Sequence, residues 1–251
     1  MPEDFILILA AFLTSTLSAI IGMGGGITLL GIMAIVMPDG FLVVAYHGIV
    51  QLVSNATRTY VFRSHINRAI LSRYSVGLFL GLFLSIALIL LMIFSFNVDS
   101  ASKLKIELLK PLIGIYILWF LFFRKKGTKV KDSAFQIMGI LSGIVTVFVG
   151  AAGPLIAPLF IAKDLTKEVI IATKAACQAL GHFLKIPIFY FLFDVSYVSD
   201  WKVILPLVIS VYIGTNFGKI MLGRLPESLF KKIFRLALAL IAVRLLLSSF
   251  Y

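Results

Sequence analysis

Cysteine is nearly absent from this 251-residue chain, in which Cys177 is the only one. With a single cysteine, no intrachain disulfide can form and no multi-cysteine metal site can be built. We interpret Cys177 as a small packing residue, because free buried cysteines usually have that role. We expect no bound metal and no other cofactor.

Acidic residues are scarce as well: eleven stand against 23 lysines and arginines, which gives a formal net charge of +12. None of the eleven falls in the central part of an apolar segment. They are Glu3, Asp4, Asp39, Asp99, Glu107, Asp132, Asp164, Glu168, Asp194, Asp200 and Glu227. A cation carrier would normally keep a carboxylate at its site within the membrane, so this distribution favours an anionic ligand. It also leaves no paired carboxylates, Ser/His/Asp set or metal-ligand cluster at depth, so we do not expect an enzyme.

Long polar stretches are missing too. Hydrophobic residues make up 61% of the chain and the mean hydropathy is +1.08, more than a soluble core of this size needs. The composition predicts an all-α integral membrane protein without a sizeable soluble domain. Its positive charge could indicate nucleic acid, but the charged residues lie in loops between apolar segments. We expect a lipid bilayer, and no nucleic acid, as the partner.

Two glycine-rich breaks interrupt the apolar segments. The segments cover residues 5–21, 26–37, 41–62, 69–96, 107–123, 134–150, 153–162, 168–192, 201–222 and 228–250. Two of them, 26–37 and 153–162, are too short to cross a bilayer, which takes about 20 helical residues. Each follows a longer segment across a break. We interpret each pair as a helical hairpin with its tip inside the membrane, where irregular backbone is tolerated only if protein buries it or it lines a cavity.

Two apolar segments each carry four polar residues at spacings of four, four and three, which places each set on one helix face. The quartets are His47, Gln51, Asn55, Arg58 and Lys174, Gln178, His182, Lys185, and an offset of 127 residues (from 47 to 174) relates them. This repetition indicates an internal duplication that keeps polar groups facing inward in both halves. Polar groups in a membrane are costly, so the pattern is typical of a transport site.

Lysine and arginine are distributed unevenly among the loops. If the N-terminus lies outside, inner loops hold fourteen of the 23, and outer loops hold only Lys103, Lys105, Lys110 and Lys202. This is the positive-inside pattern, and it supports both termini outside. Three full crossings per half then invert the halves relative to each other. We predict one membrane domain of two inverted repeats, each a broken hairpin plus three transmembrane helices, at 1–126 and 132–251, with a basic cytoplasmic linker at 124–132.

Each short segment begins a helix at depth, at Gly26 or at Gly153, where Pro154 suits a first helical turn. Such a helix N-terminus offers unpaired N–H groups and about half a positive charge, which favours anions. The predicted substrate-binding residues are Gly24, Gly25, Gly26, Gln51, Asn55, Arg58, Gly153, Lys174, Gln178, His182 and Lys185. His47 and His182 are the candidates for proton coupling, because an unperturbed imidazole titrates near neutrality.

These charged and polar groups have structural alternatives. Arg58, Lys174 and Lys185 lie about five to seven residues from a segment end and could extend to the interface instead. We favour that interpretation for Arg244, which belongs to neither quartet. The two histidines could be hydrogen-bonded structural residues.

The glycines have structural alternatives as well. The first break could only permit close helix packing, although four glycines in five residues make a poor helix. Gly77 with Gly81, and Gly214 with Gly218, read G-x-x-x-G, and we interpret both pairs as close-packing sites.

The run Gly22-Met23-Gly24-Gly25-Gly26 after a first apolar helix, then a short apolar segment, Pro38 and the helix with Ala45, resembles the N-terminal motif of the TauE/SafE sulfite exporter family. The second half, from Gly150-Ala151-Ala152-Gly153-Pro154 through the helix with Ala172 to Lys185, resembles its second repeat. The resemblance covers essentially the whole chain. It implies transport of sulfite, sulfonates such as sulfoacetate, or related small anions across a bacterial inner membrane, generally outward. Members differ in substrate, and the second break has alanines where the first has glycines.

We therefore expect a secondary transporter that exports such anions by alternating access at a midplane site. The break glycines would supply backbone donors, Gln51 and Gln178 would orient the oxyanion, and the buried cations would balance its charge. An inside-negative potential pushes an anion outward by about 2.3 kcal/mol per charge per 100 mV, so facilitated efflux would suffice. An anion channel, or an uptake carrier for another small anion, stays open. So does the oligomeric state.

Overall fold

The computed structural model describes residues 2–37, 40–96, 109–123 and 130–247, and all regular structure in these ranges is helical. The α-helices are α1 (Pro2–Ile21), α2 (Gly25–Val36), α3 (Gly40–Val61), α4 (Arg68–Phe96), α5 (Leu109–Leu118), α6 (Ser133–Phe148), α7 (Gly153–Ala162), α8 (Lys167–Phe193), α9 (Trp201–Gly223) and α10 (Glu227–Leu247). A 3₁₀ turn, η1 (Arg63–His65), precedes α4, and a π-helical segment, η3 (Trp119–Phe123), continues α5. The all-α prediction is confirmed, and the helices follow the predicted apolar segments closely.

Four of the described helices are long and apolar enough to cross a membrane, namely α1, α4, α8 and α9. The polar face of α3 and the basic residues of α10 make those two helices less apolar, although both exceed 20 residues. Large apolar side chains cover the outside of the bundle; Phe83 and Phe94 of α4 and Phe191 of α8 are 70–86% exposed. In water this surface would be a severe liability, whereas lipid chains would cover it.

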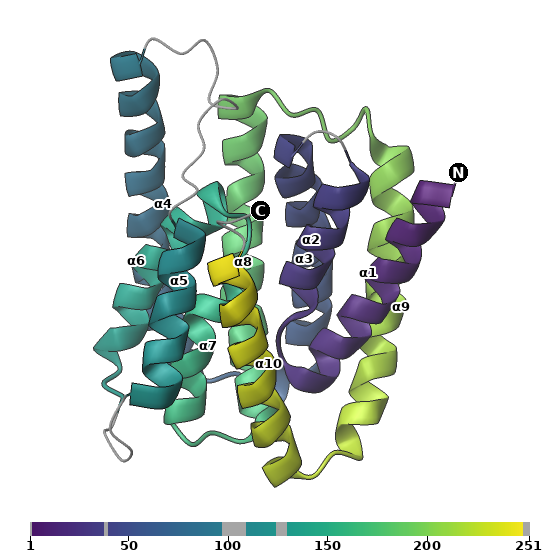
Figure 1. Ribbon diagram of the computed structural model, residues 1–251, viewed down its shortest axis with the longest axis vertical. Coiled ribbons are helices and arrows are strands. Elements are labelled where there is room, and N and C mark those ends of the chain that lie inside the picture. The colour runs from purple at the N-terminus through teal and green to yellow at the C-terminus, as the bar shows by residue number, and fades with distance from the viewer. Residues whose placement is uncertain (1, 38–39, 97–108, 124–129, 248–251) are drawn as a thin grey trace.

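Both predicted breaks interrupt the helices. Gly22 and Gly24 have φ of +83° and +90°, and Gly150 has φ of +89°, values that only glycine adopts readily. Packing alone therefore does not explain the first break. α7 begins at Gly153 with Pro154 in its first turn, as predicted, and α2 begins at Gly25, one residue earlier than predicted. In Figure 1 the turn between α1 and α2 lies within the height of the bundle, above the lower ends of α9 and α10.

The two halves, α1–α5 and α6–α10, interlock. α1 packs on α9 and α4 on α6, while α3 packs on α8 and α5 on α10 (Figure 1). The G-x-x-x-G pairs lie at these contacts: a Cβ on Gly77 would be 1.9 Å from the carbonyl oxygen of Gln136, and one on Gly218 would be 2.5 Å from that of Thr16. Both pairs therefore permit close packing. The inverted relation of the halves stays a prediction, as does their division into repeats, and linker residues 124–129 lie outside the described residues.

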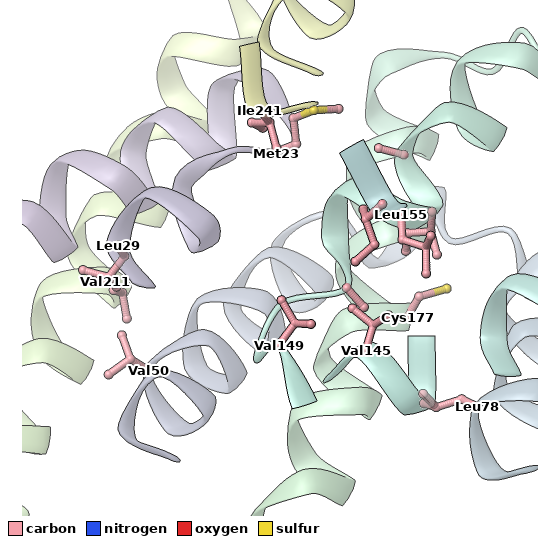
Figure 2. Packing of buried hydrophobic residues seen from close by; sticks show 14 of the residues in the cluster. Met23, Leu29, Val50, Leu78, Val145, Val149, Leu155, Cys177, Val211 and Ile241 are labelled. Atoms are coloured by element: carbon pink, nitrogen blue, oxygen red, sulfur yellow. The ribbon is translucent and has the colours of Figure 1, made fainter. Parts of the chain in front are cut away.

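Apolar side chains from both halves form one buried cluster around the helical breaks. Figure 2 shows Met23, in the α1–α2 turn, beside Ile241 of α10, and Leu29 of α2 beside Val211 of α9. Cys177 is buried in this cluster, consistent with a packing role. The core thus fixes both hairpin turns against helices that are distant in sequence.

Candidate functional site

A small cavity of about 20 Å³ lies between the two hairpin turns, α3 and α8. It is lined by Ser18, Met23, Gly24, Gly26, Ile27, His47, Gln51, Arg58, Ala151, Gly153, Pro154, Lys174, Gln178 and His182. Most of the predicted substrate-binding residues are in this set. Three are not: Gly25, Asn55 and Lys185 lie outside the lining.

The positive charges near the cavity are buried. Arg58, Lys174 and Lys185 are 2%, 1% and 0% exposed, and their hydrogen bonds run to groups inside the protein. The alternative in which these side chains extend to the interface is therefore wrong. No acidic side chain is among the described residues that line the cavity. A buried positive charge without a counter-charge is costly, so a bound anion would stabilise the charged forms of these side chains.

Arg58 is held at four points. Its Nη1 donates to the Ser18 hydroxyl at 2.8 Å and to the Ser18 carbonyl at 3.2 Å, and its Nε donates to the Ser54 carbonyl at 3.4 Å. Nη2 donates to Asn55 Oδ1 at 2.5 Å. Asn55 in turn donates to the Gln51 carbonyl, so its side chain orients the guanidinium from behind and does not reach the cavity.

Lys174 links the two halves at the cavity. From α8 it donates to the Gly22 carbonyl in the first break and to Gln178 Oε1, both at 3.0 Å. It therefore contacts the end of α1 through a main-chain oxygen that the break leaves outside regular helix. Arg58 and Lys174, one from each half, converge on the same turn.

Lys185 lies in the seam between α3 and α8. Its Nζ donates to the Val44 carbonyl at 3.1 Å and lies 5.4 Å from the centre of the Phe189 ring. The approach depends on Gly48, because a Cβ there would be 2.8 Å from Lys185 Cε. The structure thus places this predicted site residue in a helix–helix contact beside the cavity.

The glutamines face the first turns of the two short helices. A Cβ on Gly26 would lie 2.9 Å from Gln51 Oε1, and one on Gly153 would lie 2.5 Å from Gln178 Nε2. Glycine at each position allows the amide to lie directly on the helix N-terminus. Each half therefore places one amide and one set of helix-start N–H groups at the same cavity.

The two histidines meet across the halves, with ring centres 5.9 Å apart in an edge-on arrangement. His47 Nε2 lies 2.8 Å from the Gly26 carbonyl, which can only accept, so this nitrogen carries the proton. His182 Nδ1 is buried and has no hydrogen-bond partner among the described residues. His47 Nδ1 is likewise buried without a partner among the described residues, so each ring has an uncommitted Nδ1, and His47 in addition has the structural bond that the alternative interpretation required.

Sequence reasoning missed Ser18, which lines the cavity and contacts Arg58. The available signal was weak: a hydroxyl one helical turn before Gly22, in a helix that contains several other small polar residues. Arg244 lies elsewhere, exposed on α10, and a Cβ on Gly31 would be 1.9 Å from its Nη2.

Comparison with known families gives one match over nearly the whole chain. The model of a family described as sulfite exporter TauE/SafE matches residues 7–245. No curated protein and no solved structure matches the chain.

Proposed function

The chain belongs to the TauE/SafE sulfite exporter family, and from this premise we propose that it carries a sulfur oxyanion of the sulfite or sulfonate type outward across a bacterial inner membrane. Transport would proceed by alternating access at the cavity between the hairpin turns. The observation that carries the proposal is the pairing of Arg58 and Lys174. They come from different halves, they are buried, and no described acidic residue shares the lining. An anion bound between them would supply the missing counter-charge.

The remaining lining suits an oxyanion. Backbone N–H groups at Gly24, Gly26 and Gly153 would donate to its oxygens, as helix starts commonly do to anions. Gln51 and Gln178 would orient it, since an amide can donate to one oxygen and accept from a protonated one. The arrangement uses one short helix and one amide from each half, so a small anion would hold the halves together.

The size of the cavity supports a carrier. A volume of about 20 Å³ compares with the roughly 10–15 Å³ that one water molecule needs on the same measure. An anion of four or more heavy atoms requires more room, so the walls must separate to admit it. A carrier that opens to one side at a time does this in each cycle. Recordings in a planar bilayer would test the channel alternative, because unitary currents would contradict a carrier.

Proton coupling, if present, would use the histidine pair. His47 and His182 are adjacent and both line the cavity. In vesicles containing the wild type, a sulfite gradient would then produce a pH change that His47→Ala/His182→Ala vesicles lack. An unaltered pH change in the double variant would exclude these two residues.

Thermal unfolding of the purified protein in detergent tests the proposed site. The ligand panel is sulfite, sulfate, thiosulfate, sulfoacetate, taurine, acetate and chloride. A ligand at 100 times its Kd should stabilise the protein by about 2.7 kcal/mol and raise the Tm by roughly 5–10 °C. Gln51→Ala/Gln178→Ala should lose this shift, while Gln136→Ala, a glutamine of α6 outside the cavity, should keep it. No shift with any anion would contradict the substrate class.

A further inference from the structure

Ser18 has the position of a ligand at this cavity. It lies one helical turn before the end of α1 at Ile21, is 4% exposed and lines the cavity beside Arg58. A Cβ on Gly25 would lie 2.7 Å from Ser18 Cβ, so the serine is packed under the start of α2. Its side chain is therefore fixed in the angle between the two helices of the hairpin.

The Ser18 hydroxyl accepts a hydrogen bond but does not donate one to a described residue. Ser18 Oγ accepts from Arg58 Nη1 at 2.8 Å, which occupies a lone pair and leaves the O–H proton to be donated. Within the described part of the chain it donates to nothing. Its neighbours in α1 behave differently: Thr14 donates to the Ala10 carbonyl at 2.6 Å and Ser15 to the Phe12 carbonyl at 3.0 Å. Such bonds back to the preceding turn are the usual arrangement for helical serine and threonine.

Both lone pairs of the Ser18 carbonyl oxygen are occupied, so this oxygen is not free to accept the hydroxyl proton. The Ser18 carbonyl already accepts from Arg58 Nη1 and from the Gly22 N–H, at 3.2 and 2.9 Å. A hydroxyl that accepts from a guanidinium is polarised, which strengthens its own O–H as a donor. An unused, strengthened donor that is buried at the cavity wall is suited to a negatively charged acceptor.

We infer that the Ser18 hydroxyl donates a hydrogen bond directly to an oxygen of the transported anion, so that Ser18 and Arg58 act as a joint ligand. The inference rests on the proposed function. It adds a ligand from α1, the helix that ends at the first break, to the ligands from α3 and α8. Binding would then engage the hairpin itself, which is the element that must move if the cavity is to open.

Sulfite affinity of purified protein tests this role, measured by calorimetry on the wild type, Ser18→Ala and Ser15→Ala. Ser15 is the matched control, since it lies in the same helix, is equally buried and already donates within that helix. Loss of a hydrogen bond to a charged group should raise the Kd of Ser18→Ala about ten- to a hundredfold, and Ser15→Ala should stay within about twofold. The Tm without anion should be similar for the two variants, which separates binding from folding.

Ser18→Cys covers the case in which Ser18→Ala does not fold. A thiol is a weak donor of similar size, so its Kd should again exceed that of the wild type. A Kd of Ser18→Ala or Ser18→Cys equal to that of Ser15→Ala would overturn the inference and leave the proposed function intact. Absence of sulfite or sulfonate binding by the wild type would overturn both.

Discussion

At the scale of single residues, Gly26 and Gly153 set how closely the two glutamines approach the short helices. Each lacks the Cβ that would lie within 3 Å of a glutamine side-chain atom. The amides can therefore lie against the N–H groups at the helix starts and share a ligand with them. Gly26 is the second residue of α2 and Gly153 the first of α7, so a methyl group at either position would disturb the site more than the backbone.

We predict that Gly26→Ala and Gly153→Ala each weaken anion binding about five- to tenfold, because the methyl group displaces a glutamine that makes about one hydrogen bond to the ligand. The amides are flexible, so the Tm without anion should change by less than about 3 °C. Calorimetry with sulfite and thermal unfolding would measure the two effects. Gly223→Ala is the control, since nothing lies within 4 Å of a Cβ there; equal affinities in all three variants would contradict the prediction.

The sequence predicted which faces of α3 and α8 carry polar groups, because a spacing of four, four and three fixes a helix face. It could not predict which residues meet across the helices. The repeat aligns His47 with Lys174, yet the structure places His47 against His182. It also could not separate Asn55, which orients Arg58, from the residues that line the cavity. The axial offset and the rotation of one helix relative to the other depend on how the two helices pack. The spacing of polar residues within a single helix does not contain this information.

At the scale of elements, an ion pair joins the two helices of the second hairpin at its open end. Asp132, which precedes α6, and Lys163, which follows α7, have side chains 2.5 Å apart, with Arg73 of α4 at 4.0 Å from the same carboxylate. The Lys163 hydrogen bond and positive charge lower the pKa of Asp132 from its ordinary 3.8. The pair holds α6 and α7 together at the end opposite their glycine turn.

We predict that Asp132→Asn lowers the Tm slightly at neutral pH, by at most about 2 °C because the pair is partly exposed. A carboxyl whose pKa is lower in the folded state stabilises the protein above its unfolded pKa, near 3.8, and this contribution is lost as pH falls through the folded value. The gap in Tm between wild type and variant should therefore shrink once the pH drops below about 4.

Thermal unfolding from pH 7 to pH 3 would measure this gap. Asp194→Asn is the control, because that carboxylate is exposed at the end of α8 and makes no ion pair with a described residue. A gap that widened as the pH fell would contradict the sign of the effect.

The helical breaks were the most predictable elements. The glycine run at 22–26 and the glycines and proline at 150–154 both disfavour regular helix, and positive φ values occur in them at Gly22, Gly24 and Gly150. The π-helical segment η3 after α5 was not predictable, because Trp119 to Phe123 is an unbroken apolar run that suits regular helix equally well. A local change of helical pitch depends on the neighbours against which such a run packs.

At the scale of the whole molecule, positive charge gathers at one end of the bundle. The α7–α8 connection with Lys163, the start of α8 at Lys167 and the α9–α10 connection with Arg224 lie toward the lower end in Figure 1, and the α8–α9 connection lies at the upper end. This separation is what the positive-inside distribution requires of the connections. We propose that the lower end faces the cytoplasm and both termini face outward.

Cysteine labelling would test this orientation in a Cys177→Ala background. Ser64, within η1, and Ser196, between α8 and α9, are both exposed and would each be changed to cysteine in turn. A membrane-impermeant maleimide added outside intact cells should label Ser196→Cys strongly, and should label Ser64→Cys only after the cells are permeabilised. The reverse pattern would show that the molecule is inserted the other way.

The packing partners of the helices were beyond the sequence. The G-x-x-x-G pairs in α4 and α9 indicated close contacts, but any helix with small residues could have been the partner. The observed partners, α6 for α4 and α1 for α9, belong in each case to the other half of the chain. Such contacts depend on how the ten α-helices of the described residues fit together, and the sequence of one segment does not contain this information.

The contact between α1 and α9 also constrains how the protein is made. α1 ends at Ile21 and α9 begins at Trp201, so the ribosome must add about 180 residues before α1 meets the helix that carries Gly214 and Gly218. At roughly 5–20 residues per second this takes on the order of ten to forty seconds. Throughout that interval Thr16, which later donates to the Gly214 carbonyl, lacks its final partner. Until α9 is made, the insertion machinery or the surrounding lipid must therefore cover the α9-facing side of α1. Truncated chains that end before α9 should be degraded by membrane proteases faster than the full-length chain.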